Sequence, residues 1–303
     1  KFEKSCNINL VTDLGLELYS DVDKLIDDLN SVERYVPSKW EWLDNCLGGG
    51  FLEAGKALYV FAGETNIGKS IFLGNIASNM AKDGKNVLLV TLEMSELLYA
   101  RRLCSNVTKI PMKELADNTP SIKQAMNDQG GKIFIKEFPP ATITANQLKA
   151  FIKKFQEQGI KIDAIVLDYL NLMHSPVGNN SYERIKHVTE QVRAMSYLFN
   201  CPIISATQLN RAGFDTDNPD LATISESIGL AATADAIISI FQNEEDRGIG
   251  IIRLGMMKNR YGPRGITQAM RIDYTTLTIE QADDIEIDED MDNTLNVLAG
   301  LAS

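Results

Sequence analysis

The sequence predicts an α/β fold in which helices cover both faces of a mostly parallel sheet. Three observations carry this prediction. Short apolar runs, which suit buried strands, alternate with helical stretches from residue 57 to residue 241. A glycine-rich loop joins the first of these strands to the first helix. After residue 249 three strand-like segments follow one another without helices, which predicts antiparallel edge strands at the C-terminal end of the sheet.

The individual elements are read from hydrophobic periodicity and from turn residues at their ends. The predicted strands of the parallel part span residues 57–62, 86–92, 132–138, 162–169, 202–206 and 236–241, and the edge strands span 249–257, 267–273 and 277–280. The predicted helices span residues 69–81, 95–105, 145–158 and 182–199. Gly84 is expected to end the first of these helices, because glycine commonly follows a helix C-terminus.

Three parts of the chain are predicted: an N-terminal arm over 1–35, a core over 36–282 and an acidic tail over 283–303. Ser20 is expected to cap a short helix in the arm. An apolar stripe on that helix is formed by Leu18, Val22, Leu25, Ile26 and Leu29. Such a short helix is not stable alone. It must dock either on its own domain or on a neighbouring subunit, and spacing alone favours neither.

The composition is that of a globular protein, with 44% hydrophobic and 23% charged residues. The net charge is −11, and eight acidic residues without a basic one lie between Glu280 and Asp292, so the rest of the chain carries only about −3. The four cysteines form no C-x-x-C pair, which favours reduced thiols in a cytosolic protein over a zinc site. No apolar run is long enough to span a bilayer. The chain begins with Lys1 rather than Met, which leaves open that it is a fragment of a longer protein.

A phosphate-binding loop is the strongest motif. Residues 63–70 read Gly-Glu-Thr-Asn-Ile-Gly-Lys-Ser and fit G-x-x-x-x-G-K-[ST] without a mismatch. Backbone N–H groups of such a loop cradle phosphate oxygens, Lys69 reaches the β- and γ-phosphates, and the Ser70 hydroxyl ligates Mg²⁺. ATP and Mg²⁺ are therefore the expected cofactors. The predicted nucleotide-binding residues are Gly63, Glu64, Thr65, Asn66, Ile67, Gly68, Lys69, Ser70 and Ile71.

Three polar side chains follow predicted strands that should end near this loop. Asp168 closes an apolar strand about a hundred residues after the loop, where a carboxylate would complete the Mg²⁺ shell. Glu93 follows another strand and is either the group that deprotonates the attacking water or a surface acid. Gln208 either senses the γ-phosphate by hydrogen bonding or simply marks the end of a strand.

The segment from Met257 to Gly265 places three cations on what we expect to be a tight turn between antiparallel strands. These cations are Lys258, Arg260 and Arg264. A basic turn is either solvated or meets an anion, such as the ATP of another subunit approached by an arginine finger.

Taken together, these segments resemble the motor domain of the DnaB-type hexameric replicative DNA helicases, and the T-even-like phage members of that family most closely. The resemblance covers roughly Tyr35 to Glu280. Residues 91–94 resemble the family's S-L-E-M, 208–211 its Q-L-N-R, 258–263 its K-x-R-x-G-P, and 226–235 its E-S-G-x-I-x-x-D-A-D. The resemblance implies a RecA-like P-loop NTPase core.

The resemblance also implies roles for single residues. Glu93 is then the catalytic base, Arg260 the finger that reaches the next subunit's ATP, and Lys258 a second γ-phosphate contact. Loops over 175–184 and 211–229 are expected to face the DNA channel. The expected DNA-binding residues are Arg184, Lys186, Arg211, Glu226 and Gly229. Ser225 stands where the family often has Arg, which weakens the case for a side-chain phosphate contact there.

The resemblance further implies a homohexameric ring that moves 5′ to 3′ on single-stranded DNA in the cytoplasm, or in the host cytoplasm if the chain is phage-encoded. It favours docking of the arm helix on the adjacent subunit. A primase and a helicase loader are the expected protein partners, and the acidic tail either binds one of them or only aids solubility. Two other functions share this fold, a RecA- or RadA-like recombinase and a KaiC-like regulatory ATPase.

Overall fold

The protein is described by a computed structural model, which covers residues 15–30, 34–209 and 228–282. The chain divides into two compact units, Lys1–Arg34 and Tyr35–Ser303. The first contains helix α1 (Val22–Asn30), on which Val22, Ile26 and Leu29 are exposed.

The start of α1 differs from the sequence prediction. The residue that precedes the helix is Asp21, whose carbonyl oxygen accepts hydrogen bonds from the backbone N–H groups of Lys24 and Leu25. The Ser20 hydroxyl instead donates to the Glu17 carboxylate. The prediction that Ser20 caps the helix is therefore wrong, because the helix begins at Val22, and Asp21, not Ser20, stands in the cap position.

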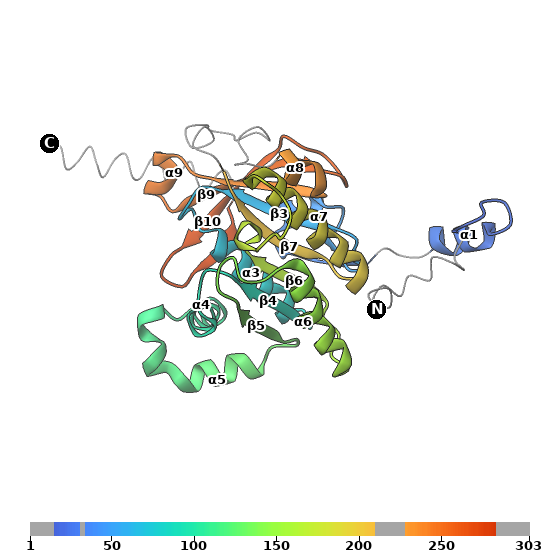
Figure 1. Ribbon diagram of the computed structural model, residues 1–303. Coiled ribbons are helices and arrows are strands. Elements are labelled where there is room, and N and C mark those ends of the chain that lie inside the picture. The colour runs from blue at the N-terminus through green and yellow to red at the C-terminus, as the bar shows by residue number, and fades with distance from the viewer. Residues whose placement is uncertain (1–14, 31–33, 210–227, 283–303) are drawn as a thin grey trace. The chain divides into compact units, whose positions relative to one another are not determined.

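The second unit is built on a nine-stranded sheet within the described residues, with the strand order β11-β10-β9-β8-β3-β7-β6-β4-β5 (Figure 1). Six strands are parallel: β3 (Leu58–Gly63), β4 (Val87–Thr91), β5 (Ile133–Glu137), β6 (Ala164–Asp168), β7 (Ile203–Gln208) and β8 (Ala236–Phe241). Three follow antiparallel at one edge: β9 (Ile251–Asn259), β10 (Thr267–Asp273) and β11 (Thr278–Gln281). A separate antiparallel pair joins β1 (Tyr35–Val36) to β2 (Phe51–Leu52). The predicted fold class is confirmed.

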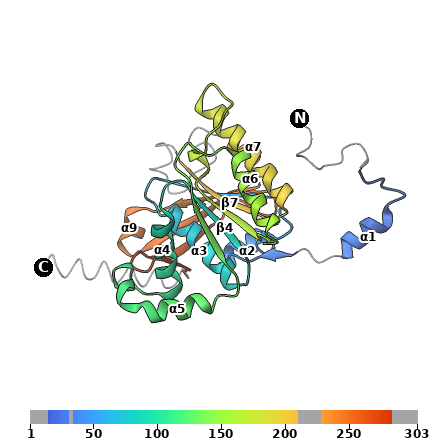
Figure 2. The same ribbon diagram turned by 60° about the horizontal axis from the view of Figure 1, so that its bottom comes forward.

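Helices cover both faces of this sheet, as Figure 2 shows for α3 on one side and α6 and α7 on the other. The first face packs on α2 (Glu41–Cys46), α3 (Lys69–Lys82) and α4 (Glu96–Thr108), and the second on α6 (Ala145–Glu157), α7 (Ser181–Phe199) and α8 (Ile228–Thr233). The remaining elements are η1 (Met112–Asn118), α5 (Thr119–Asn127), η2 (Leu170–Leu172) and α9 (Glu244–Gly248).

Strand residues alternate between the two faces and form two cores. On β3, Tyr59 and Phe61 face the α3 side, while Leu58 and Val60 face the α7 side. All four are fully buried. Burial of one such side chain contributes about 1.5–3 kcal/mol, so the parallel strands form a rigid platform. Their carboxyl ends meet at one edge, which is where open α/β sheets bind ligands.

Most predicted elements are confirmed, with ends that differ from the prediction by no more than three residues. The segment that contains η1 and α5 was not predicted, and no residue of α5 is buried. Leu277 is not in a strand; it has a positive φ of 58° in the turn before β11. The predicted loop over 212–223 lies outside the described residues.

Candidate active site

The phosphate-binding loop lies between β3 and α3, as the motif predicts. Asn66 and Gly68 have positive φ values of 65° and 104°, which turn the loop over the start of the helix. A side chain at Gly63 would force its neighbours to shift, since a Cβ atom there would lie 2.8 Å from Ile67 Cγ2 and 3.1 Å from the carbonyl oxygen of Ile240. The backbone N–H groups at the N-terminus of α3 therefore face a concave loop that suits phosphate oxygens.

Lys69 is the first residue of α3, and its ammonium group folds back onto the loop. It donates to the carbonyl oxygen of Gly63 at 3.1 Å and to that of Glu64. Burial lowers the pKa of Lys69, while the carboxylates of Glu93 and Asp168 oppose that shift. The ammonium therefore sits among acceptors at the place where the phosphates of a nucleotide would add negative charge.

Asp168 ends β6 beneath the same loop. Its side chain is fully buried, and neither carboxylate oxygen has a hydrogen-bond partner of normal geometry among the described residues. Burial raises the pKa of Asp168 to about 6, although the nearby Ser70 and Tyr99 hydroxyls act in the opposite direction. An unpartnered buried carboxylate is costly unless a cation meets it.

The residues here fit a bound Mg²⁺. The ion prefers oxygen ligands, keeps several waters and is commonly held by one or two protein groups together with substrate phosphates. Asp168 offers an orphaned carboxylate and Ser70 a hydroxyl. The Tyr99 hydroxyl donates to the Ser70 carbonyl oxygen at 3.1 Å and so fixes the first turn of α3. Sequence reasoning missed Tyr99, which looks like an ordinary core residue of α4.

Glu93 follows β4 in a turn that is held by Thr91. The Thr91 hydroxyl accepts from the Met94 N–H at 3.0 Å and donates to the Met94 carbonyl oxygen at 3.0 Å. In the sheet Thr91 pairs with Asp168, so the ends of β4 and β6 lie side by side. This turn leaves the Glu93 carboxylate exposed at the rim of the site.

Gln208 ends β7, where it pairs with Gly63 of β3. Its side-chain amide donates to the Thr65 hydroxyl at 2.5 Å. Gln208 therefore touches the phosphate loop directly, which is the position that a sensor of the γ-phosphate would need.

A cavity of about 410 Å³ brings these groups together. It is lined by Thr65, Asn66, Gly68, Lys69, Ser70, Ile71, Glu93, Met94, Leu98, Arg102, Tyr169, Gln208, Tyr274 and Leu277. Lys69, Glu93 and Gln208, which are far apart in the sequence, thus share one cavity. Arg102, Tyr169 and Tyr274 were not predicted, because no motif marks them and only folding brings them to this edge.

A second cavity of about 690 Å³ adjoins the first, and the two share Tyr169 and Gln208. Its wall includes the polar loop before α7 and Arg184, whose Nε atom donates to the Gly178 carbonyl oxygen at 3.2 Å. Lys186 lies further along α7 and packs against Gly229, where a Cβ atom would lie 2.7 Å from Lys186 Cβ. Three of the predicted DNA-binding residues therefore lie on α7 and α8, while Arg211 and Glu226 lie outside the described residues.

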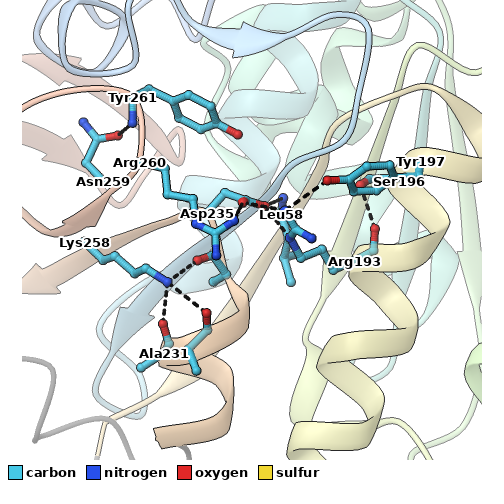
Figure 3. Close-up of polar contacts among 12 residues, drawn as sticks. Leu58, Arg193, Ser196, Tyr197, Ala231, Asp235, Lys258, Asn259, Arg260 and Tyr261 are labelled. Atoms are coloured by element: carbon cyan, nitrogen blue, oxygen red, sulfur yellow. Dashed lines mark hydrogen bonds and ion pairs between the residues drawn. The ribbon is translucent and has the colours of Figure 1, made fainter. Parts of the chain in front are cut away.

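The basic segment differs from the expected tight turn. β9 continues along β8 as far as Asn259. Lys258 pairs with Ile237 of β8 and therefore belongs to a strand and not to a turn. Lys258 and Arg260 do not line the nucleotide cavity of their own chain. Arg260 pairs with Asp235 at 2.9 Å, and Lys258 donates to carbonyl oxygens at the end of α8 (Figure 3).

Comparison with known proteins places this site in a family. The profile of the DnaB-like helicase C terminal domain matches residues 36–278. The chain is 26% identical over 244 residues to a DnaB-like replicative helicase of Enterobacteria phage T4, covering 76% of this chain and 51% of that protein. It is 29% identical over 233 residues to a probable replicative DNA helicase of Trieres chinensis, covering 70% of this chain and 50% of that protein. The chain thus spans about half the length of these relatives.

Two solved structures share the fold. One is an ATPase domain, which superposes with a TM-score of 0.73 at 20% identity, over 87% of this chain and 97% of that one. The other is a DnaB-like replicative helicase studied for its interactions with primase, which superposes with a TM-score of 0.75 at 19% identity, over 88% of this chain and 69% of that one. The RecA-like core is thereby confirmed. Since the family profile covers most of its length, the chain belongs to the family of DnaB-like helicase C terminal domains.

Proposed function

We propose that this chain is the motor part of a replicative DNA helicase that hydrolyses ATP, moves 5′ to 3′ along single-stranded DNA and unwinds duplex at the replication fork. Membership of the family supports an ATPase of the helicase type. The observation that carries the proposal is the cavity that the phosphate loop, Glu93 and Gln208 line together, in which Lys69 lies close enough to the buried Asp168 carboxylate for that charge to act on its pKa.

The chemistry of this cavity suits phosphoryl transfer to water. The Lys69 ammonium and the N–H groups of the loop hold the β- and γ-phosphates, and Asp168 with Ser70 holds Mg²⁺, which when bound neutralises charge that builds up on the phosphate oxygens. Glu93 accepts a proton from the attacking water as the new P–O bond forms. The bond between the γ-phosphorus and the bridging oxygen breaks, and ADP and phosphate leave.

We further propose that the site is completed by a neighbouring subunit in a six-membered ring. Arg260 and Lys258 are absent from the cavity of their own chain, while half of the Arg260 side chain is exposed. Their guanidinium and ammonium groups would meet the γ-phosphate of the next subunit. Loss of that phosphate removes a charge-assisted contact and lets the interface reorient. The exposed apolar stripe of α1 would dock on the adjacent subunit.

We propose that DNA is held by the segments over 175–184 and 211–229. Arg184 and the adjacent Lys186 lie on α7 and Gly229 lies on α8 in the described part of the chain, with Arg211 and Glu226 as the further candidates. Contacts to the phosphate backbone give binding that depends little on sequence and falls with salt. No helix among the described residues could span a membrane. The proposed compartment is the cytoplasm of the cell or host, with a primase and a loader as partners.

The test is ATP turnover with and without single-stranded DNA, followed by unwinding of forked duplexes with ATP and Mg²⁺. We expect stimulation by DNA and strand separation, and Lys69→Ala is the matched control that should lose both. An ATPase rate that single-stranded DNA leaves unchanged contradicts the proposal and favours a regulatory ATPase. Electron microscopy adds a second criterion, since open filaments in place of closed rings would indicate a recombinase.

A further inference from the structure

Asp235 is a buried acid whose side chain accepts hydrogen bonds from three separate parts of the chain. It lies directly before β8 and is 1% exposed. Its Oδ1 atom accepts from Arg193 Nη2 and Arg260 Nη1, each at 2.9 Å. Its Oδ2 atom accepts from Arg193 Nε and from the Leu58 N–H, each at 2.9 Å. Figure 3 shows these contacts converging on one carboxylate.

The backbone of Asp235 extends the same linkage. Its N–H donates to the Leu58 carbonyl oxygen at 2.9 Å, and its own carbonyl oxygen accepts from the Arg260 N–H at 3.0 Å. Leu58 begins β3, which runs directly into the phosphate loop. Asp235 therefore connects the strand that carries the nucleotide site of this chain to the cation that would serve the site of its neighbour.

The contact with Asp235 orients Arg260 but engages only part of its guanidinium group. Only its Nη1 atom bonds to a side chain among the described residues, and 48% of the side chain is exposed. A guanidinium has five N–H donors in a fixed planar fork. One edge is thus held by Asp235, while the remaining donors can meet a phosphate.

Lys258 is held beside it by the end of α8. Its ammonium donates to the carbonyl oxygens of Ala231, Ala232 and Ala234 at 2.7, 3.2 and 2.6 Å. Burial and the nearby Arg260 guanidinium lower the pKa of Lys258. Both cations of the proposed intersubunit contact are therefore anchored on the short stretch from Ala231 to Asp235.

We propose that Asp235 is the positioning residue for the Arg260 guanidinium and acts through it on the ATP of the adjacent subunit. The proposal rests on the proposed function, because it requires Arg260 to work in trans. It differs from two other roles that the same geometry would allow. Asp235 could serve only to pair with Arg193 on α7, or it could restrain Arg260 and slow hydrolysis.

The first test compares Asp235→Asn with Arg193→Gln. The Asn variant keeps the shape of the side chain but loses its charge and one acceptor, so we expect kcat to fall about 10- to 100-fold, as misplaced catalytic groups commonly cause. Nucleotide affinity should stay the same, because Asp235 does not line the cavity. Arg193→Gln removes two bonds from the same carboxylate yet leaves the pair with Arg260, so its kcat should remain within about threefold of wild type.

The variants also separate positioning from stability. Thermal unfolding should show that both proteins fold and that both lose some stability. In an Arg260→Ala background, Asp235→Asn should cause no further fall in the residual kcat, because a residue that acts through Arg260 has nothing left to act on. A further fall of similar size, equal falls for Asp235→Asn and Arg193→Gln, or a rise in kcat for Asp235→Asn would each overturn the proposal.

The second test assigns Asp235 to one side of the interface by mixing defective subunits. Asp235→Asn protein mixed with Lys69→Ala protein should regain ATPase activity, because some interfaces then pair an intact loop with a well-held finger. Mixed with Arg260→Ala protein it should regain none, since both lack the finger side. Recovery of ATPase activity in the mixture with Arg260→Ala would overturn only the proposed role of Asp235 and would leave the proposed function in place. The reference mixture of Lys69→Ala with Arg260→Ala tests the shared site itself, and its failure would overturn the proposed function and this proposal together.

Discussion

At the scale of the residue, Asp168 illustrates how far one side chain can be understood from sequence. Its place at the end of an apolar strand predicted a metal-binding carboxylate. The structure adds that both oxygens are buried, that neither has a hydrogen-bond partner of normal geometry among the described residues, and that burial raises the pKa to about 6. The same feature that suits a cation therefore costs stability whenever no cation is bound, because an ionised carboxylate is kept away from water.

We predict that Asp168→Asn abolishes ATP hydrolysis yet raises stability at pH 8 when nucleotide and Mg²⁺ are absent. The pKa of Asp168 is raised in the fold, so the buried group favours folding only at low pH, and this contribution is lost as pH rises from about 4 through about 6. The gain from Asn should be about 1–3 kcal/mol above pH 7 and should vanish near pH 4.

Denaturant unfolding at a series of pH values measures this difference. Addition of ATP and Mg²⁺ is the control, because it should stabilise wild type more than the variant. If the Asn variant is no more stable than wild type at pH 8, neighbouring groups compensate the charge of the buried Asp168 carboxylate and the prediction is wrong.

Glu93 supports a second prediction. Glu93→Gln keeps the size of the side chain but cannot accept a proton, so ATP should still bind while kcat falls about 10²- to 10⁴-fold. Glu96 provides a matched control nearby, since it pairs with Lys136 at 2.6 Å and does not line the cavity. If the Glu93→Gln and Glu96→Gln proteins are equally active, Glu93 is a surface acid and not the catalytic base.

At the scale of the element, strands and long helices follow from apolar periodicity, whereas short surface helices do not. The strand β8 and the edge strand β10 have the predicted bounds. The helix α5 was not predicted from the sequence, and none of its residues is buried. The bounds of β9 also differ from the prediction. The strand extends to Asn259 because it continues to pair with β8 after its pairing with β10 has ended.

A capping motif allows a prediction at this scale. The Thr144 hydroxyl accepts from the Gln147 N–H at 3.3 Å, and the Gln147 side chain accepts from the Thr144 N–H at 2.8 Å, which together cap α6. Thr144→Ala should lower the free energy of unfolding by about 1 kcal/mol. ATPase activity should not change, because no residue of α6 lines the nucleotide cavity.

Thermal unfolding and ATP turnover check this prediction together. Thr144→Ser keeps the hydroxyl and should match wild type in both. A loss of activity in Thr144→Ala that Thr144→Ser does not share would mean that α6 has a role in the site beyond packing on the sheet.

At the scale of the whole molecule, the distribution of charge and the proposed assembly bear on the proposed function. Most of the net charge of −11 comes from one acidic stretch, so the remainder is close to neutral and can carry local basic surfaces. The groups that hold phosphates and those proposed to complete the site lie apart within one chain. The proposed ring would place each set against the other, because a head-to-tail interface uses different surfaces of the two subunits.

This arrangement predicts complementation between defective proteins. Lys69→Ala and Arg260→Ala should each retain only a small residual ATPase activity as pure proteins. At equal mixing about one interface in four has both an intact loop and an intact finger, so partial ATPase activity should return and peak near that ratio. Steady-state turnover across mixing ratios is the measurement, with Lys69→Ala mixed with Glu93→Gln as a control that should not recover. No recovery at any ratio would argue against a shared site.

The sequence alone determined the fold class, the phosphate loop and the three polar strand ends, because apolar periodicity and glycine placement are local properties that survive without knowledge of contacts. Only the tertiary structure decided that the Asp168 carboxylate lacks a hydrogen bond of normal geometry among the described residues, that Arg102 and Tyr274 line the cavity while Tyr99 contacts Ser70, and that Asp235 pairs with Arg260. These facts depend on which residues meet across the sheet edge, and side chains far apart in the sequence acquire neighbours only when the strands pair in register.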